Sequence, residues 1–114
     1  MSKGRYVTKG VNDMAKTKEQ IVSDLKIYIR DLGGEYSKWY IGIAADARKR
    51  LFDDHKVEER GGKGWIFRKC ESSDIAREIE KYFIDTLGTA GGSGGGDDDT
   101  DKIYAYKITP TTIE

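Results

Sequence analysis

The sequence predicts a single small α+β domain in which a short three- or four-stranded, mainly antiparallel sheet is flanked by about three helices. Three observations lead to this fold class. The 114 residues suffice for one compact domain and are too few for two. The composition, 37% apolar and 35% charged, is typical of a globular protein with a solvated surface. Helical and strand-like segments alternate along the chain, so one sheet covered by helices is the economical packing.

The clearest helix is predicted between Thr17 and Gly33. Thr17 and Gln20 have the spacing of a capping box, and Gly33 stands where a helix C′ glycine belongs. The polar side of this helix includes Ile27. The apolar residues recur at the helical period and form one face: Ile21, Val22, Leu25, Tyr28, Ile29 and Leu32.

Two further helices and three strands are expected downstream. Asp46 is a good N-cap for a helix over residues 47–56, and Ser72 or Ser73 caps a helix that ends at Gly88. The strands are predicted at residues 39–44, 65–70 and 102–108, which are rich in aromatic and β-branched side chains.

The remaining segments lack periodicity. Residues 1–16 form an N-terminal segment in which residues 5–8 could be an edge strand, and residues 17–108 form the domain itself. Residues 91–101 are predicted to be a mobile loop, because ordering glycine costs backbone entropy and neighbouring aspartates repel one another. Pro110 ends the last strand, which leaves residues 109–114 as a tail.

Bulk charge and cysteine content exclude some classes of site. The 20 basic and 20 acidic residues cancel, so a nucleic-acid partner would need local positive charge. Cys70 is the only cysteine, which excludes an intramolecular disulfide and zinc sites with C-x-x-C spacing. The N-terminus lacks an apolar signal core and no run reaches membrane-spanning length. We therefore expect a cytoplasmic protein, monomeric by default, without a membrane partner.

A tripeptide and two charged residues carry the functional signal. The predicted strand at residues 39–44 contains Tyr40-Ile41-Gly42, and Arg50 follows Tyr40 by ten residues on the next helix. Glu80 lies on the third helix, four residues before Ile84 and after a strand of aromatic residues. This ordered set, over residues 40–84, resembles the core of a GIY-YIG nuclease domain.

The resemblance implies metal-assisted hydrolysis of DNA phosphodiester bonds. Tyr40 would orient or deprotonate the attacking water, Arg50 would neutralise charge on the phosphate, and Glu80 would hold a single Mg²⁺ or Mn²⁺. The remaining candidates are His55 as a second acid or base, Gly42, Arg48, Lys49 and Tyr104 as substrate-binding residues. Independently of the family, Glu80 lies at the border of an apolar helix face, where a carboxylate is desolvated unless it binds a cation.

The flanks of this span depart from the family pattern. Lys26-Ile27-Tyr28 lies where the family's first strand is expected, but these residues belong to the predicted first helix. Either that strand is absent or Lys102-Ile103-Tyr104 fills its place. A histidine or tyrosine is expected four residues after the arginine, where Asp54 stands, and His55 comes one residue later. The family's later asparagine has no counterpart, since Asn12 is the only asparagine.

Each candidate also has a structural explanation. Tyr40 could be an ordinary strand tyrosine, Arg50 could pair only with Asp54, and His55 could be a half-buried structural histidine. The alternative to a nuclease is a catalytically inactive module that binds nucleic acid or a protein partner. A weaker third option is phosphate or metal binding by the glycine-aspartate loop, although it lacks the P-loop ending and EF-hand spacing. The nuclease hypothesis predicts that Tyr40, Arg50 and Glu80 share one concave surface.

Overall fold

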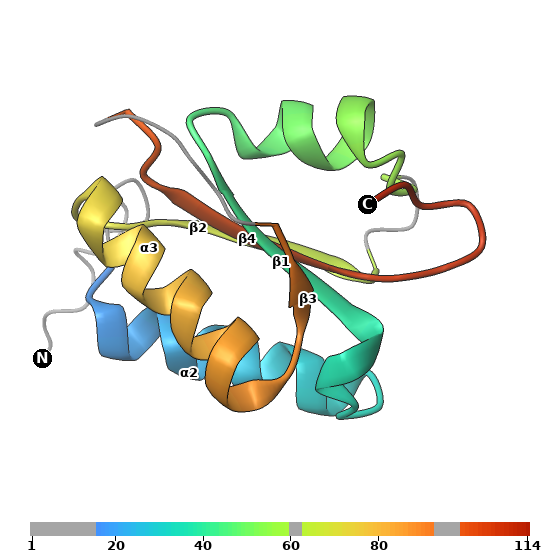
Figure 1. Ribbon diagram of the computed structural model, residues 1–114, viewed down its shortest axis with the longest axis horizontal. Coiled ribbons are helices and arrows are strands. Elements are labelled where there is room, and N and C mark those ends of the chain that lie inside the picture. The colour runs from blue at the N-terminus through green and yellow to red at the C-terminus, as the bar shows by residue number, and fades with distance from the viewer. Residues whose placement is uncertain (1–15, 60–62, 93–98) are drawn as a thin grey trace, which may run out of the picture.

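The computed structural model describes residues 16–59, 63–92 and 99–114, which form a four-stranded sheet with helices on both faces (Figure 1). The strands are β1 (Trp39–Ala44), β2 (Trp65–Lys69), β3 (Ala90–Gly91) and β4 (Lys102–Lys107), in the spatial order β2-β4-β1-β3. The central strand β4 is antiparallel to both β1 and β2, whereas β3 is parallel to β1. The chain is therefore one compact α+β domain with a mixed, mostly antiparallel sheet, as the sequence predicts.

The sheet corrects three predicted boundaries. Gly91 belongs to β3 and pairs with Ile41, so the predicted loop does not begin at residue 91. The second and last strands each end one residue earlier than predicted, at Lys69 and Lys107. Residues 93–98 of that loop, and residues 1–15 with the suggested edge strand, lie outside the described residues.

The first predicted helix is confirmed as α2 (Lys18–Asp31). Thr17 and Gln20 form both hydrogen bonds of the capping box, and Gly33 follows the C-cap with a φ of +120°. The side chains of Ile21, Leu25 and Ile29 are fully buried. The predicted faces are therefore those that the tertiary structure uses.

The third predicted helix begins as α3 (Ser73–Lys81), with Ser72 as its N-cap. It continues as a π-helical turn (Tyr82–Leu87) and ends at Gly88, whose φ is +88°. Helices α2 and α3 cover one face of the sheet, and the main core lies between them and the strands (Figure 1). None of the helices within the described ranges has both the length and the apolar character needed to cross a membrane.

The opposite face of the sheet is covered by a short helix at residues 47–54 (Figure 1). Asp46 caps it, since its Oδ1 accepts a hydrogen bond from the main-chain N–H of Lys49 at 3.1 Å. From Lys49 to Asp54 the helix is π-helical. It was predicted to reach Lys56, but Lys56 has a φ of +59°, which is incompatible with a right-handed helix.

A second core lies under this short helix. It is formed by Tyr40, Ala44, Ala47, Leu51, Val57, Tyr104 and Tyr106. Every residue of β1 is buried, because this core packs against one side of the strand and the α2–α3 core against the other. The second core gathers the tyrosines of β1 and β4 in one place.

Cys70 provides a simple check of this packing. The thiol is buried, and burial together with the nearby charge of Asp101 raises its pKa to about 11. Since the thiolate is the reactive form, we expect the native protein to resist an aromatic disulfide reagent at pH 8 and to react fully in denaturant. Absorbance of the released thiolate measures both rates, and rapid reaction of the native protein would contradict the described burial.

Candidate functional site

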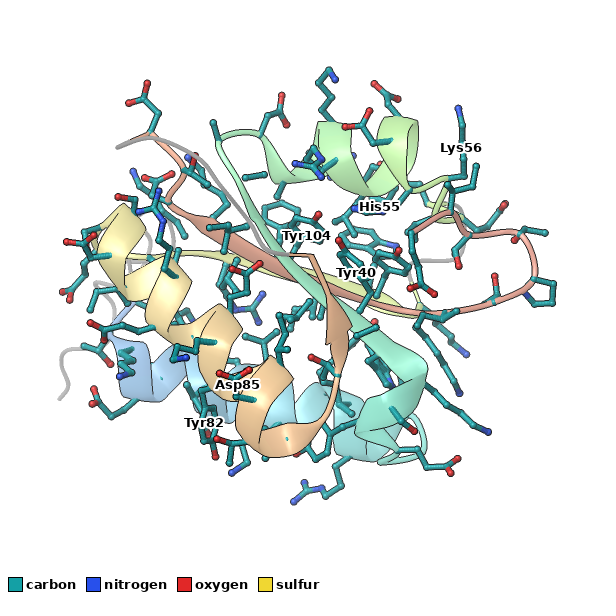
Figure 2. The ribbon with its side chains drawn as sticks, viewed as in Figure 1. Tyr40, His55, Lys56, Tyr82, Asp85 and Tyr104 are labelled. Atoms are coloured by element: carbon teal, nitrogen blue, oxygen red, sulfur yellow. The ribbon has the colours of Figure 1, made fainter. Side chains whose placement is uncertain are left out.

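The site is built on two tyrosine-bearing strands. Because β4 runs antiparallel to β1, Tyr106 lies opposite Tyr40 and Tyr104 lies opposite Gly42. The ring of Tyr40 is stacked with that of Tyr106 at 5.1 Å and with that of Tyr104 at 6.4 Å between centroids. Strand pairing thus brings together tyrosines that are more than sixty residues apart in the sequence (Figure 2).

Gly42 makes room for this arrangement. A Cβ atom at position 42 would lie 2.9 Å from Cε2 of Tyr104 and closer still to the hydroxyl oxygen of that ring. Carbon atoms do not approach so closely without displacing one another. The glycine of the Tyr-Ile-Gly tripeptide therefore lets the Tyr104 side chain lie across β1. Its role in this structure is to leave space for the Tyr104 ring.

His55 is the polar centre of the cluster. Its Nε2 lies 2.7 Å from the hydroxyl oxygen of Tyr104, and its Nδ1 lies 2.7 Å from the main-chain oxygen of Ile113. The hydroxyl group of Tyr106 lies 3.1 Å from the same Nδ1 and donates to the Ile113 oxygen at 3.3 Å. The His55 ring also packs on the ring of Tyr40, with centroids 4.8 Å apart (Figure 2).

The surroundings of His55 favour its neutral form. Only 3% of the residue is exposed, and this burial lowers its pKa below the usual value. The hydrogen bond to Ile113 opposes this shift, whereas the positive charge of Arg50 adds to it. His55 is therefore a neutral hydrogen-bonding group near pH 7. It is more deeply buried than the half-buried histidine considered from the sequence.

Arg50 reaches the cluster from the short helix. Its Nε lies 3.0 Å from Oδ2 of Asp54, which is the ion pair considered from the sequence. The N–H direction is poor, so this Nε has no hydrogen-bond partner within the described residues. The charge of Arg50 also lowers the pKa values of Tyr40 and Tyr104, against the larger upward effect of burial. The guanidinium group therefore acts on the tyrosines as well as on Asp54.

Glu80 lies on α3, which covers the face of the sheet opposite the short helix. It is 8% exposed, and burial raises its pKa to about 7, although the charge of Arg77 opposes this shift. The charge of Glu80 raises the pKa values of Tyr40 and Tyr104. The charges of Arg50 and Glu80 thus both act on Tyr40 and Tyr104, from helices that cover opposite faces of the sheet. The expectation that Tyr40, Arg50 and Glu80 line a concave surface stays a prediction.

The chemistry of Glu80 fits a hard divalent cation. Its carboxylate is buried, and Mg²⁺ and Mn²⁺ prefer oxygen ligands. Residues 16–59, 63–92 and 99–114 contain no group of three or more histidine, cysteine or acidic side chains arranged to hold a metal. An ion at Glu80 would therefore have this one carboxylate as its protein ligand there and would retain several waters, as Mg²⁺ commonly does.

Two predicted substrate-binding residues lie at the surface beside the cluster. Arg48 pairs with Glu59, and its guanidinium group lies 5.2 Å from the ring centre of Phe52. Lys49 is mostly exposed, and its Nζ lies 3.6 Å from Oδ1 of Asp54. Neither side chain contacts a tyrosine of the cluster in the interactions described, so any role in binding would be that of a surface cation.

Sequence reasoning missed three contributors. Tyr106 has a signal, because it lies two residues after Tyr104 and strand alternation directs both side chains to the same face. The main-chain N–H of Gly92 donates to the Tyr40 hydroxyl, and the main-chain oxygen of Ile113 faces His55. Main-chain groups are the same in every residue type, so the roles of Gly92 and Ile113 could be recognised only in the folded structure.

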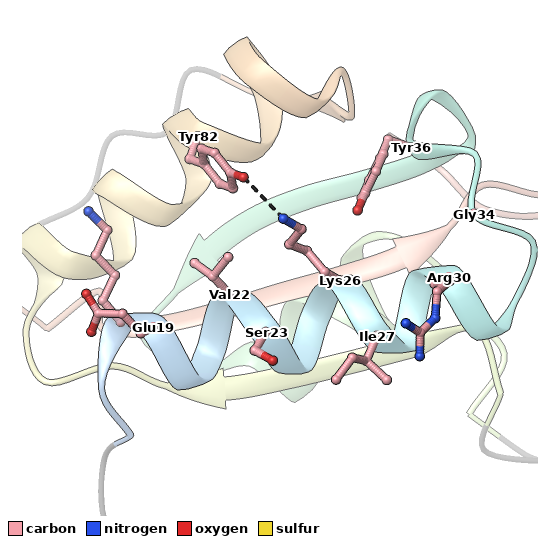
Figure 3. A pocket seen from close by; sticks show the side chains of 10 residues that line it. Glu19, Val22, Ser23, Lys26, Ile27, Arg30, Gly34, Tyr36 and Tyr82 are labelled. Carbon is pink, nitrogen blue, oxygen red and sulfur yellow. Dashed lines mark hydrogen bonds between the residues drawn. The ribbon is translucent and has the colours of Figure 1, made fainter.

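A separate hollow of about 730 Å³ lies along the outer face of α2 (Figure 3). Val22, Ile27 and the rings of Tyr36 and Tyr82 supply much of its apolar wall, and Nζ of Lys26 lies 3.4 Å from the Tyr82 hydroxyl. None of the cluster residues lines it. We therefore place the candidate chemistry at the tyrosine–histidine cluster, where buried groups with shifted pKa values converge.

No protein-family model, curated protein or solved structure matches this chain. The functional argument therefore depends on the arrangement of the cluster itself.

Proposed function

We propose that this domain is a GIY-YIG-like endonuclease that hydrolyses phosphodiester bonds of DNA with the help of one divalent metal ion. The observation that carries the proposal is the contact of Tyr40, His55 and Tyr104, together with the charges of Arg50 and Glu80 that act on these tyrosines. These residues come from β1, the short helix and its end, α3 and β4. A structural tyrosine or histidine alone would not require a buried carboxylate and an arginine nearby.

The position of β4 supports the proposal. The family's first strand should lie beside the Tyr-Ile-Gly strand, and the sequence lacks it at the expected place. In the fold, Lys102-Ile103-Tyr104 runs antiparallel beside residues 42–44 of β1, with Tyr104 opposite Gly42. We infer that β4 takes the place of that first strand. The order of the strands along the chain would then differ from that of the family, while the strand beside Tyr-Ile-Gly would occupy the same position in the sheet.

The π-helical turn supports it at a second point. In an α-helix the residue four positions after Arg50 would lie over it, but that residue is Asp54. In the π-helical turn the main-chain N–H of His55, five positions on, donates to the oxygen of Arg50 at 2.8 Å. The wider turn accommodates the extra residue and brings the main chain of His55 against that of Arg50, which supports the match of His55 to the family pattern.

The roles follow from the positions of these groups. The Tyr40 hydroxyl, fixed by the Gly92 N–H, would orient the attacking water, and the Tyr104 ring, fixed by His55, would support the Tyr40 ring. Arg50 would offset the negative charge that grows on the phosphate. Glu80 would hold the metal ion, which when bound supplies Lewis-acid stabilisation of the leaving oxygen.

One observation favours the alternative of an inactive binding module. Arg50 is paired with Asp54, and Arg48 and Lys49 also lie beside acidic side chains. An arginine engaged in this way must turn from its partner before it can bind a phosphate. The missing family asparagine points the same way, so the cleavage test must distinguish catalysis from binding.

Supercoiled plasmid provides that test. We expect the full chain to nick or linearise it with Mg²⁺ or Mn²⁺, and Arg50→Ala and Glu80→Gln each to slow the reaction by about 100-fold or more, as loss of a transition-state contact does. Gel electrophoresis of the plasmid forms over time gives the rates. Arg50→Lys, which keeps the charge but not the planar fork, should recover only part of the activity.

The matched control is Arg30→Ala, which removes an exposed arginine of α2 that pairs with Asp31. It should cleave at the rate of the unmodified protein. Equal cleavage by all variants would identify a contaminant, and absence of cleavage together with salt-sensitive DNA binding would favour the binding module.

A further inference from the structure

The segment after β4 reaches back to the site through Ile113. The main-chain N–H of Ile113 donates to the oxygen of His55 at 2.7 Å, and the Ile113 oxygen lies 2.7 Å from His55 Nδ1. A threonine turn holds this segment, because the Thr112 N–H donates to the Thr109 oxygen at 3.2 Å and the Thr112 hydroxyl accepts from the Thr109 N–H at 3.0 Å. In Figure 1 this end of the chain lies beside the short helix that carries Arg50.

These contacts determine which nitrogen of His55 carries the proton. A carbonyl oxygen can only accept, so the nitrogen that faces Ile113 at 2.7 Å must be the N–H donor. In the neutral ring Nε2 is then an acceptor, and the Tyr104 hydroxyl at 2.7 Å must donate to it. Tyr104 has a single proton, so its oxygen presents only lone pairs to any other group.

We propose that the main-chain carbonyl of Ile113 is a positioning group that holds His55 in the Nδ1–H tautomer and thereby fixes the buried Tyr104 hydroxyl as the donor to Nε2. This order of hydrogen bonds fixes the Tyr104 ring, which stacks with the ring of Tyr40, the residue that would orient the attacking water in the proposed function. In the opposite tautomer, Nε2–H would donate to Tyr104, and the phenolic proton would turn outward.

The charged and titratable groups around His55 support the neutral ring. Tyr40 faces it from β1, Tyr104 and Tyr106 from β4, and Arg50 and Asp54 from the short helix, while Glu114 follows Ile113. Burial, the largest effect, and the charge of Arg50 lower the His55 pKa, which outweighs Ile113, Asp54 and Glu114. Only acidification would place an N–H on both ring nitrogens and reverse the bond to Tyr104.

The single histidine of the chain makes a direct measurement feasible. Long-range ¹H–¹⁵N correlation spectra of the full chain at pH 7.5 contain one imidazole, and we expect the pattern of the Nδ1–H tautomer. Ending the chain at Thr112 removes the Ile113 carbonyl and should produce a mixture with the Nε2–H tautomer. An Nε2–H ring in the full chain, or an unchanged ring in the folded shortened protein, would overturn the inference.

Glu114→Gln is the matched control, since it removes a charge and keeps the Ile113 carbonyl, and its tautomer should be unchanged. Circular dichroism establishes whether the shortened chain folds. If it does not, Thr112→Ala loosens the same turn and should shift the tautomer in the same direction, and no shift in this folded variant would overturn the inference. The spectra require no DNA cleavage, so an inactive protein with the Nδ1–H tautomer would refute the proposed nuclease function and leave this inference intact.

Discussion

Gly42→Ala is expected to destabilise the domain by about 3 kcal/mol, the upper range for an overpacked core. The added methyl group would overlap the hydroxyl end of the Tyr104 ring, which is only 1% exposed and therefore has no space in which to retreat. A displaced ring would also lose its 2.7 Å hydrogen bond to His55. Urea denaturation followed by circular dichroism measures the free energy of unfolding.

A double-mutant cycle supplies the control for Gly42→Ala. Tyr104→Leu alone removes the ring that the methyl group would strike, so Gly42→Ala in that background should cost less than about 1 kcal/mol. The difference between the two costs measures the steric conflict itself. An equal cost in both backgrounds would mean that Gly42 serves the strand for another reason, such as main-chain freedom.

Glu80→Gln is expected to stabilise the metal-free domain above pH 7 by about 1–3 kcal/mol. Burial raises the pKa of Glu80 from 4.5 to about 7, and each unit corresponds to about 1.4 kcal/mol. Below pH 4.5 the carboxyl group is neutral in both the folded and the unfolded chain, so it costs nothing. As the pH rises from 4.5 to about 7, the unfolded chain releases the proton first, and the free energy of unfolding falls. Glutamine has no proton to release and removes this dependence.

Urea titrations of both proteins between pH 4 and 8, without metal, measure the two profiles. Glu78→Gln is the matched control, because Glu78 lies on the same helix but is mostly exposed and pairs with Lys18. Its profile should follow that of the unmodified protein. Parallel profiles for Glu80→Gln and the unmodified protein would mean that Glu80 is not desolvated.

Metal ions should reverse the order of stability. A divalent cation bound to Glu80 neutralises the buried carboxylate and stabilises only the folded state, so Mn²⁺ should raise the melting temperature of the unmodified protein. The glutamine variant should show no such rise. This readout is independent of DNA cleavage, and it separates a metal-binding carboxylate from one that is merely buried.

The local elements were largely predictable because their signals lie within a few residues of one another. The capping box at Thr17, the glycine at residue 33 and the serine cap at residue 72 each depend on main-chain hydrogen bonds over one helical turn. The alternation of small or β-branched residues with tyrosines in β4 reflects its two buried faces. By contrast, β3 has two residues and forms by pairing with the edge of β1. No local sequence pattern predicts such a short strand.

The candidate residues were found from their spacing along the chain, but the contacts between them could not be found in that way. Sequence spacing gave Tyr40, Arg50 and Glu80 as an ordered set, and it left His55 one residue from its expected position. The i-to-i+5 hydrogen bond from His55 to Arg50 belongs to a π-helical turn, which has no clear sequence signature. Likewise, the pairing of Gly42 with Tyr104 explains a glycine that the sequence could only match to a motif.

By itself, then, the sequence determined the α+β class and the caps and faces of its helices, and it suggested candidate residues for acid, base and phosphate chemistry. Only the tertiary structure decided that β4 lies beside β1, and that the Tyr104 hydroxyl and the Ile113 carbonyl face the two nitrogens of His55. The physical reason is one of range. Capping and amphipathic periodicity act over one or two helical turns, whereas strand pairing and contacts between main-chain and side-chain groups join residues brought together only by the whole fold.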